Sequence, residues 1–130
     1  MEIVVSQEHG RVPVTVFHLK GDLNWEEPLQ SWAKEAYTEG TRNLLLDLTE
    51  VPYISSAGLR ALHYIFMLLR TDAPGESDEA MKQGIAAGTF RSPHLKLLKP
   101  SKNAMKSLNI AGYDMFLEIH QHLKDAIASF

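Results

Sequence analysis

The chain has 130 residues, of which 45% are hydrophobic and 22% are charged, a composition typical of one soluble globular domain. Its net charge of −3 and dispersed basic residues give no electrostatic case for binding nucleic acid. The absence of cysteine excludes disulfides, thiolate catalysis and cysteine-based zinc sites. The first residues lack the basic segment and long apolar stretch of a signal peptide, and no apolar run is long enough to span a membrane. We therefore expect a cytoplasmic protein.

The chain opens with two predicted strands, over residues 2–6 and 11–19. In the second strand, three valines alternate with other residues in the period-two pattern of a strand with two different faces. Gly10 is expected in the turn between the strands. Pro13 has no N–H to donate, so we expect that part of the ladder to lie at an edge.

Residues 21–24 are expected to end the second strand, and a helix is predicted after them. Asn24 or a near neighbour is expected to cap this helix, with Glu27 in capping-box position, and Gly40 is expected to end it. The apolar residues recur at helical spacing and form one face: Leu29, Trp32, Ala33, Ala36 and Tyr37.

The most apolar part of the chain is a predicted strand over residues 43–48, followed by a loop and a strongly apolar helix over residues 56–70. Three consecutive leucines without alternation predict a central strand that is covered on both faces. Asp47 is the one charge in this strand, and we interpret it as a hydrogen-bond anchor for the following loop. Ser55 and Ser56 stand where strand gives way to helix. Each could cap the helix or hold its hydroxyl out for modification.

The second half begins with a polar segment, residues 72–93, which we expect to be a disordered surface insertion with one or two helical turns over residues 78–83. Four further elements are predicted after it: a strand over 94–98, a helix over 100–112, a strand over 115–119 and a helix over 121–129. Strands that alternate with helices predict an α/β fold. We expect one domain over residues 1–130, with a mixed, mostly parallel sheet of about five strands and about four helices.

Enzymatic chemistry has little support in the sequence. A nucleophilic serine would require a base and an orienting acid, and residues 54–58 depart from the Gly-x-Ser-x-Gly pattern of hydrolases. The chain contains no His-Glu-x-x-His motif and no phosphate-binding glycine loop. We therefore expect no metal, no cofactor and no catalytic activity. A small serine hydrolase remains the less favoured alternative.

The central strand, loop and helix start carry a family resemblance. Leu46–Thr49 followed by Tyr53–Arg60 resembles the signature of the STAS domain, which is found in anti-sigma-factor antagonists and in the cytoplasmic tails of sulfate transporters. Leu19–Leu23, Leu95–Ser101 and Ala126–Phe130 also fit this family. The resemblance covers nearly the whole chain except residues 72–93. Without a membrane region, it points to the soluble antagonist branch.

The resemblance implies a function and a site. In that family, the serine of an Asp-Ser-x-Gly-Leu segment is phosphorylated by a partner that is both an anti-sigma factor and a serine kinase. By position this serine is Ser56. Ser55 stands where the acid usually stands, and it remains the alternative acceptor. The implied partner-binding surface consists of Ser55, Ser56, Ala57, Gly58, Arg60, His63 and Met67.

The implied mechanism is a charge switch in transcription regulation. The unmodified protein would bind the anti-sigma factor and so release a sigma factor, and a phosphate on Ser56 would abolish this contact. A different interpretation is a STAS-type scaffold or ligand-sensing regulatory subunit without phosphorylation, in which Ser55 and Ser56 only cap the helix.

Overall fold

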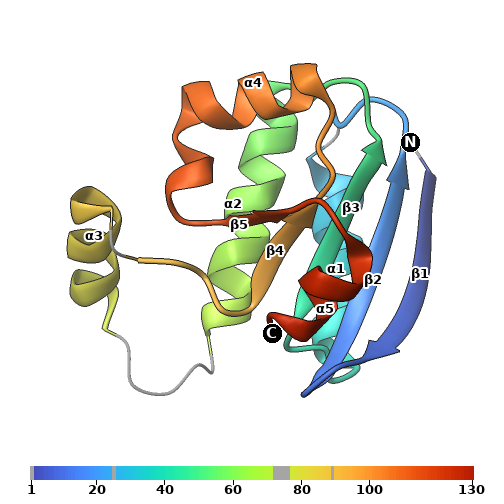
Figure 1. The fold of residues 1–130 in the computed structure, drawn as a ribbon, viewed down its shortest axis with the longest axis horizontal. Coiled ribbons are helices and arrows are strands. Elements are labelled where there is room, and N and C mark those ends of the chain that lie inside the picture. Colours follow the sequence, from blue (N-terminus) through green and yellow to red (C-terminus); the bar gives the residue numbers. More distant parts are fainter. Residues whose placement is uncertain (1, 25, 72–76, 89) are drawn as a thin grey trace.

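The computed structural model describes residues 2–24, 26–71, 77–88 and 90–130, and it has the α/β fold that the sequence predicts (Figure 1). One sheet holds five strands in chain order: β1 (Glu2–His9), β2 (Pro13–Lys20), β3 (Leu44–Glu50), β4 (Leu95–Leu98) and β5 (Glu118–His120). β1 pairs antiparallel with β2, and the remaining neighbours pair in parallel. The sheet is therefore mixed and mostly parallel, as expected.

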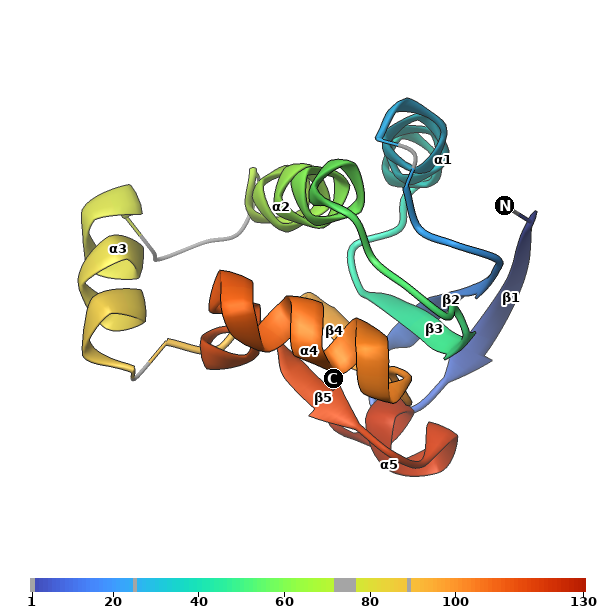
Figure 2. The same ribbon diagram turned by 90° about the horizontal axis from the view of Figure 1, so that it is seen from above.

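The described residues form five α-helices and a short 3₁₀ helix beside the strands. They are α1 (Glu27–Thr38), α2 (Ser56–Arg70), α3 (Asp78–Ala87), α4 (Lys102–Ala111), η1 (Tyr113–Met115) and α5 (Leu123–Ala128). Figure 2 shows α1 and α2 side by side on one face of the sheet and α5 on the other. No helix in the described parts of the chain is long and apolar enough to cross a lipid bilayer.

The three consecutive leucines of β3 divide between the two faces of the sheet. Leu44 and Leu46 belong to the large core that also contains the buried residues of α1 and α2. Leu45 belongs to a smaller cluster with residues of α5. All three are at most 1% exposed. A strand covered on both faces needs apolar residues at successive positions, which explains why this segment lacks alternation.

Pro13 is the first residue of β2, where its missing N–H is tolerated. The pairing of β2 with β3 begins only at Thr15, so at Pro13 the described pairing is with β1 alone. β1 itself is one of the two edge strands of the described sheet.

The start of α1 differs from the predicted capping box. The helix begins at Glu27, and the preceding Glu26 forms no side-chain capping hydrogen bond. Asn24 is exposed and does not cap the helix. The physical reason is that Leu23 forms a parallel bridge with Ile54, which keeps the chain extended at this point. Pro28 instead sets the backbone of the first turn.

The segment over residues 72–93 contains more structure than the sequence predicts. α3 spans ten residues rather than one or two turns, and Ser77 caps it by accepting a hydrogen bond from the Ala80 N–H (3.1 Å). Met81 and Phe90 are buried in the large core, so part of this segment packs against the domain. Residues 72–76 and 89 lie outside the described residues.

The last strand is shorter than predicted. Tyr113–Met115 forms the 3₁₀ helix η1, and β5 contains only Glu118–His120. Gly112 ends α4 with a left-handed backbone (φ 78°), a conformation that glycine adopts without steric cost. The Phe116 and Leu117 N–H groups then bond to the Tyr113 carbonyl, so these residues form a turn, and the pairing with β4 begins at Glu118.

Candidate functional site

Ser55 is the N-cap of α2. Its Oγ accepts a hydrogen bond from the Gly58 N–H (3.3 Å), and its Oγ–H donates to the Leu23 carbonyl (3.3 Å). The Ser55 N–H donates to the same carbonyl at 3.0 Å. Such a cap satisfies one of the N–H groups that a helix start leaves unpaired. Both the donor and an acceptor site of the Ser55 hydroxyl are therefore used by the fold.

Ser56 is the first residue of α2, and it is exposed. Within the described residues, its side chain makes no hydrogen bond to another group. The two serines thus differ sharply, although they are adjacent. Ser55 closes the helix start, whereas Ser56 presents a free hydroxyl to solvent at the positive end of the helix dipole.

The start of α2 is held by the loop that follows β2. The Leu23 N–H donates to the Tyr53 carbonyl (2.8 Å), opposite the bond from Ser55 to Leu23. Gly58 is buried directly against Leu23, and a Cβ at this position would clash with the Leu23 carbonyl oxygen. Glycine at position 58 thus allows another backbone to approach closely. Its neighbour there is this loop.

Ser101, at the N-cap of α4, ties the loop before the serines to another element. Its Oγ–H lies 3.0 Å from the Val51 carbonyl, and its Oγ accepts from the Ala104 N–H at 3.1 Å. Figure 1 shows α4 at the end of the sheet toward which β3 points. The loop that precedes Ser55 and Ser56 is therefore held on both sides.

Asp47 anchors the end of β3. One carboxylate oxygen accepts hydrogen bonds from the Thr49 N–H (3.0 Å) and hydroxyl (2.5 Å), and the other lies 2.8 Å from His18 Nδ1. Partial burial acts to raise the pKa of Asp47, but the hydrogen bonds from Thr49 and His18 outweigh it and hold the pKa below the usual value. Asp47 is consequently a carboxylate at neutral pH.

The exposed side of α2 borders a groove between α1 and α2 with a volume of about 420 Å³. Arg60 spans this groove, because its Nε lies 3.2 Å from a carboxylate oxygen of Glu26. His63 is exposed, and Met67 keeps 37% of its surface exposed. Seven residues line the groove: Glu26, Gln30, Arg60, His63, Tyr64, Met67 and Tyr113.

The structure separates the predicted surface residues into two groups. Ser56, Arg60, His63 and Met67 are exposed along α2, and Ala57 is partly exposed. Ser55 is partly buried and Gly58 is buried, so these two residues shape the helix start rather than its outer surface.

Four groove residues escaped the sequence reasoning: Glu26, Gln30, Tyr64 and Tyr113. Glu26 and Gln30 belong to the start of α1, and the side-by-side packing of α1 and α2 could have suggested them. Tyr113 comes from the far end of the chain and donates a hydrogen bond to the Leu59 carbonyl (2.9 Å). Burial raises its pKa. No sequence signal places it beside α2.

In the part of the chain that the structure describes, His63 is not placed to act as a base for Ser56. His63, seven residues later on the same helix, lies about 10 Å further along the helix axis at 1.5 Å per residue, and its ring packs near Phe66. Among the residues that the structure describes, no group of three or more histidine, aspartate or glutamate side chains could hold a metal ion.

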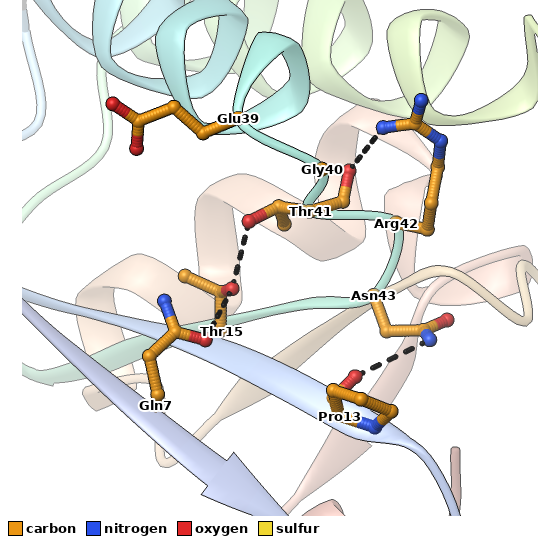
Figure 3. Close-up of a pocket in the computed structure, with 8 residues that line it drawn as sticks. All are labelled: Gln7, Pro13, Thr15, Glu39, Gly40, Thr41, Arg42 and Asn43. Atoms are coloured by element: carbon orange, nitrogen blue, oxygen red, sulfur yellow. Dashed lines mark hydrogen bonds between the residues drawn. The ribbon is translucent and has the colours of Figure 1, made fainter.

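A second cavity lies at the opposite end of the sheet, where β2 and β3 begin. It has a volume of about 460 Å³, and Figure 3 shows its lining. Its polar groups bind one another: Thr15 bonds to Gln7 (3.0 Å) and Thr41 (2.8 Å), and Asn43 donates to the Pro13 carbonyl (3.4 Å). Such mutual satisfaction leaves few groups directed at a ligand.

The family follows from a match over the part of the chain that builds this site. The model of the STAS domain matches residues 4–73, from β1 to the end of α2, and so includes both serines. The chain belongs to the STAS domain family. No curated protein sequence matches it significantly.

Solved structures extend the similarity of this STAS domain beyond residue 73. An anti-sigma factor antagonist from Mycobacterium paratuberculosis shares 16% sequence identity, with a TM-score of 0.67, and the alignment covers 98% of this chain and 93% of that one. The anti-sigma factor antagonist SpoIIAA in its unphosphorylated form shares 13% identity, with a TM-score of 0.59 and coverage of 95% and 92%. At these identities the likeness establishes a common fold.

Proposed function

We propose that this STAS domain is an anti-sigma-factor antagonist that is switched by phosphorylation of Ser56. In this proposal, the unmodified protein binds an anti-sigma factor that is also a serine kinase, and a sigma factor is released. The observation that carries the proposal is the exposed, unpartnered hydroxyl of Ser56 beside a serine that the fold has already engaged. The antagonists among the structural neighbours support the same role.

The proposed docking surface is the groove between α1 and α2 together with the start of α2. It combines an ion pair, Arg60 with Glu26, with the partly exposed apolar side chain of Met67. Interfaces commonly place flexible or aromatic apolar groups among charged ones that set orientation. The rigid helix start would keep the Ser56 hydroxyl in one position for both the binding partner and the kinase.

A phosphate on Ser56 would change the charge of this surface by about −1.5 to −2. The positive end of the α2 dipole tolerates an anion, so we expect the domain to remain folded. Arg60 lies four residues after Ser56, the spacing at which helix side chains meet. The phosphate would therefore compete with Glu26 for Arg60.

Loss of the Arg60 pairing would leave the Glu26 carboxylate beside the new dianion. Like charges at an interface cost on the order of several kcal/mol, and desolvation of the phosphate adds to this. Both effects weaken docking of a partner on the groove without requiring a change of fold. The proposed switch is thus local, and the domain itself performs no catalysis in it.

The test is phosphorylation by the cognate serine kinase with ATP, followed by site mapping with mass spectrometry. We expect one phosphate, on Ser56, and none in Ser56→Ala. Ser55→Ala is the matched control: it removes the cap, at about 1 kcal/mol of stability, but leaves the acceptor hydroxyl in place. Phosphate on Ser55 instead would move the switch to the alternative acceptor, and phosphate on neither serine would favour the scaffold alternative.

A further inference from the structure

Ser6 belongs to a row of hydrogen-bonded polar side chains on the face of the sheet that α5 covers. Ser6, His18 and Asp47 come from the adjacent strands β1, β2 and β3. The Ser6 Oγ lies 3.0 Å from His18 Nε2, and His18 Nδ1 lies 2.8 Å from Asp47 Oδ2. His18 and Asp47 are direct partners in the strand register, so the sheet itself holds this order.

The direction of each hydrogen bond follows from the chemistry of the three groups. The Asp47 carboxylate is ionised at neutral pH and can only accept, so His18 Nδ1 must carry the proton that it donates. In a neutral imidazole the other nitrogen then has a lone pair. His18 Nε2 is that nitrogen, and in this neutral form the Ser6 hydroxyl donates to it.

Neighbouring groups fix this arrangement while leaving it open to solvent. Thr49 occupies the other oxygen of Asp47 with two hydrogen bonds, which orients the carboxylate toward His18. The side chain of His18 is 36% exposed. Ser6 is partly exposed on the edge strand, and the nearby Val4 is 62% exposed. The pair formed by Ser6 and His18 is therefore only partly covered by the protein.

We propose that Ser6 is an activated nucleophile, with His18 as its general base and Asp47 as the residue that positions the imidazole. The substrate class is small, unhindered acyl esters with a good leaving group. The order of serine, imidazole and carboxylate, through these nitrogens, is that of a catalytic triad, which is recognised by geometry rather than by sequence position. This inference is independent of the proposed role of Ser56.

The reaction is an ordinary acyl transfer to the Ser6 hydroxyl. The Ser6 Oγ forms a bond to the carbonyl carbon of the ester while its proton passes to His18 Nε2. Collapse of the tetrahedral intermediate breaks the bond to the leaving alcohol, which takes the proton from His18. Water, deprotonated by His18, then attacks the acyl-serine and restores Ser6 with release of the carboxylic acid.

The test is covalent labelling of the whole chain with an alkyl fluorophosphonate, in which the serine oxygen displaces fluoride. We expect mass spectrometry to locate the adduct on Ser6. Ser56, which is exposed but has no base, serves as an internal control and should remain unlabelled. Ser6→Ala should abolish labelling, and His18→Gln should slow it about 10²-fold, the lower range for general-base assistance.

A spectroscopic measurement tests the role of Asp47 separately from labelling. ¹⁵N NMR of the His18 ring should show the proton on Nδ1 in the native chain, and Asp47→Asn should shift the tautomer toward Nε2–H. Hydrolysis of p-nitrophenyl acetate should fall in parallel. An unlabelled Ser6 in the folded native chain, labelling of other serines alone, or a native His18 with its proton on Nε2 would each overturn the proposal.

Discussion

The two faces of the sheet are built from the same strands but differ in chemistry. On the face covered by α1 and α2, alternate side chains of β2 and β3 are apolar and enter the large core, as Phe17 and Leu46 do. On the other face, the short helix α5 covers a smaller cluster. There the next positions along the strands are polar, and His18 and Asp47 bond to each other.

The difference shows how one sheet can serve as both a rigid support and a polar surface. The face covered by α1 and α2 packs against α2 and thereby fixes the position of Ser56. The α5 face can carry polar groups because His18 stays partly exposed to solvent and because each group has a partner. Lys96 illustrates the second condition: its side chain is 3% exposed, and Nζ binds Glu118 (3.1 Å) and the Ser129 carbonyl (2.8 Å).

The largest expected effect compares adjacent leucines on opposite faces of β3. Leu46→Ala should lower the free energy of unfolding by about 3–5 kcal/mol, because the large core cannot close around the cavity. Leu45→Ala should cost about 2–3 kcal/mol, because the short helix α5 can relax toward the sheet. Both residues are 0% exposed in the native chain, so burial is matched. Urea unfolding measures both values. Equal losses would contradict the distinction between the faces.

A smaller effect on stability is expected at the start of α2, where the helix joins the loop that carries Leu23. Gly58→Ala should cost about 1–3 kcal/mol, as overpacking does, because the added methyl group meets the Leu23 carbonyl. Thermal unfolding measures the change. Ala57→Gly is the neighbouring control and should cost at most about 1 kcal/mol through helix propensity. If Gly58→Ala were as stable as the native chain, the Leu23 loop would not hold the start of α2.

The smallest of these stability effects is a pH dependence on the α5 face. Because the folded pKa of Asp47 lies below its ordinary value of 3.8, ionised Asp47 stabilises the fold above that pH. This contribution should disappear as the pH falls from about 3.8 through the lower folded pKa. Unfolding of Asp47→Asn should consequently depend less on pH in this acidic window. An unchanged pH dependence in the variant would argue against the anchoring role of Asp47.

Periodicity and chain order were sufficient to predict the sheet. The uninterrupted leucines of β3 predicted a strand covered on both faces, and the signature around Ser56 predicted the family. Local propensity was less reliable where tertiary contacts determined the local structure. Leu23 pairs with Ile54 and displaces the expected cap at Asn24. Phe90 and Met81 pack on the core and order a segment that composition alone describes as polar.

The site was predictable along one element and not between elements. Helical spacing placed Ser56, Arg60, His63 and Met67 on α2, but the groove also needs Glu26 and Tyr113. These come from segments that are distant in sequence, and their approach depends on how the helices pack. The bond between Ser6 and His18 has the same origin. It depends on the strand register, which the sequence pattern left open.

The most direct test of the switch is the affinity of the cognate anti-sigma factor for two forms of the chain, measured by calorimetry. The unmodified chain should bind, and the form phosphorylated at Ser56 should bind at least about 10²-fold more weakly, which corresponds to about 2.7 kcal/mol. Thermal unfolding of both forms should be nearly the same, because the helix start accepts the anion. Equal affinity of the two forms, with both folded, would contradict the central claim.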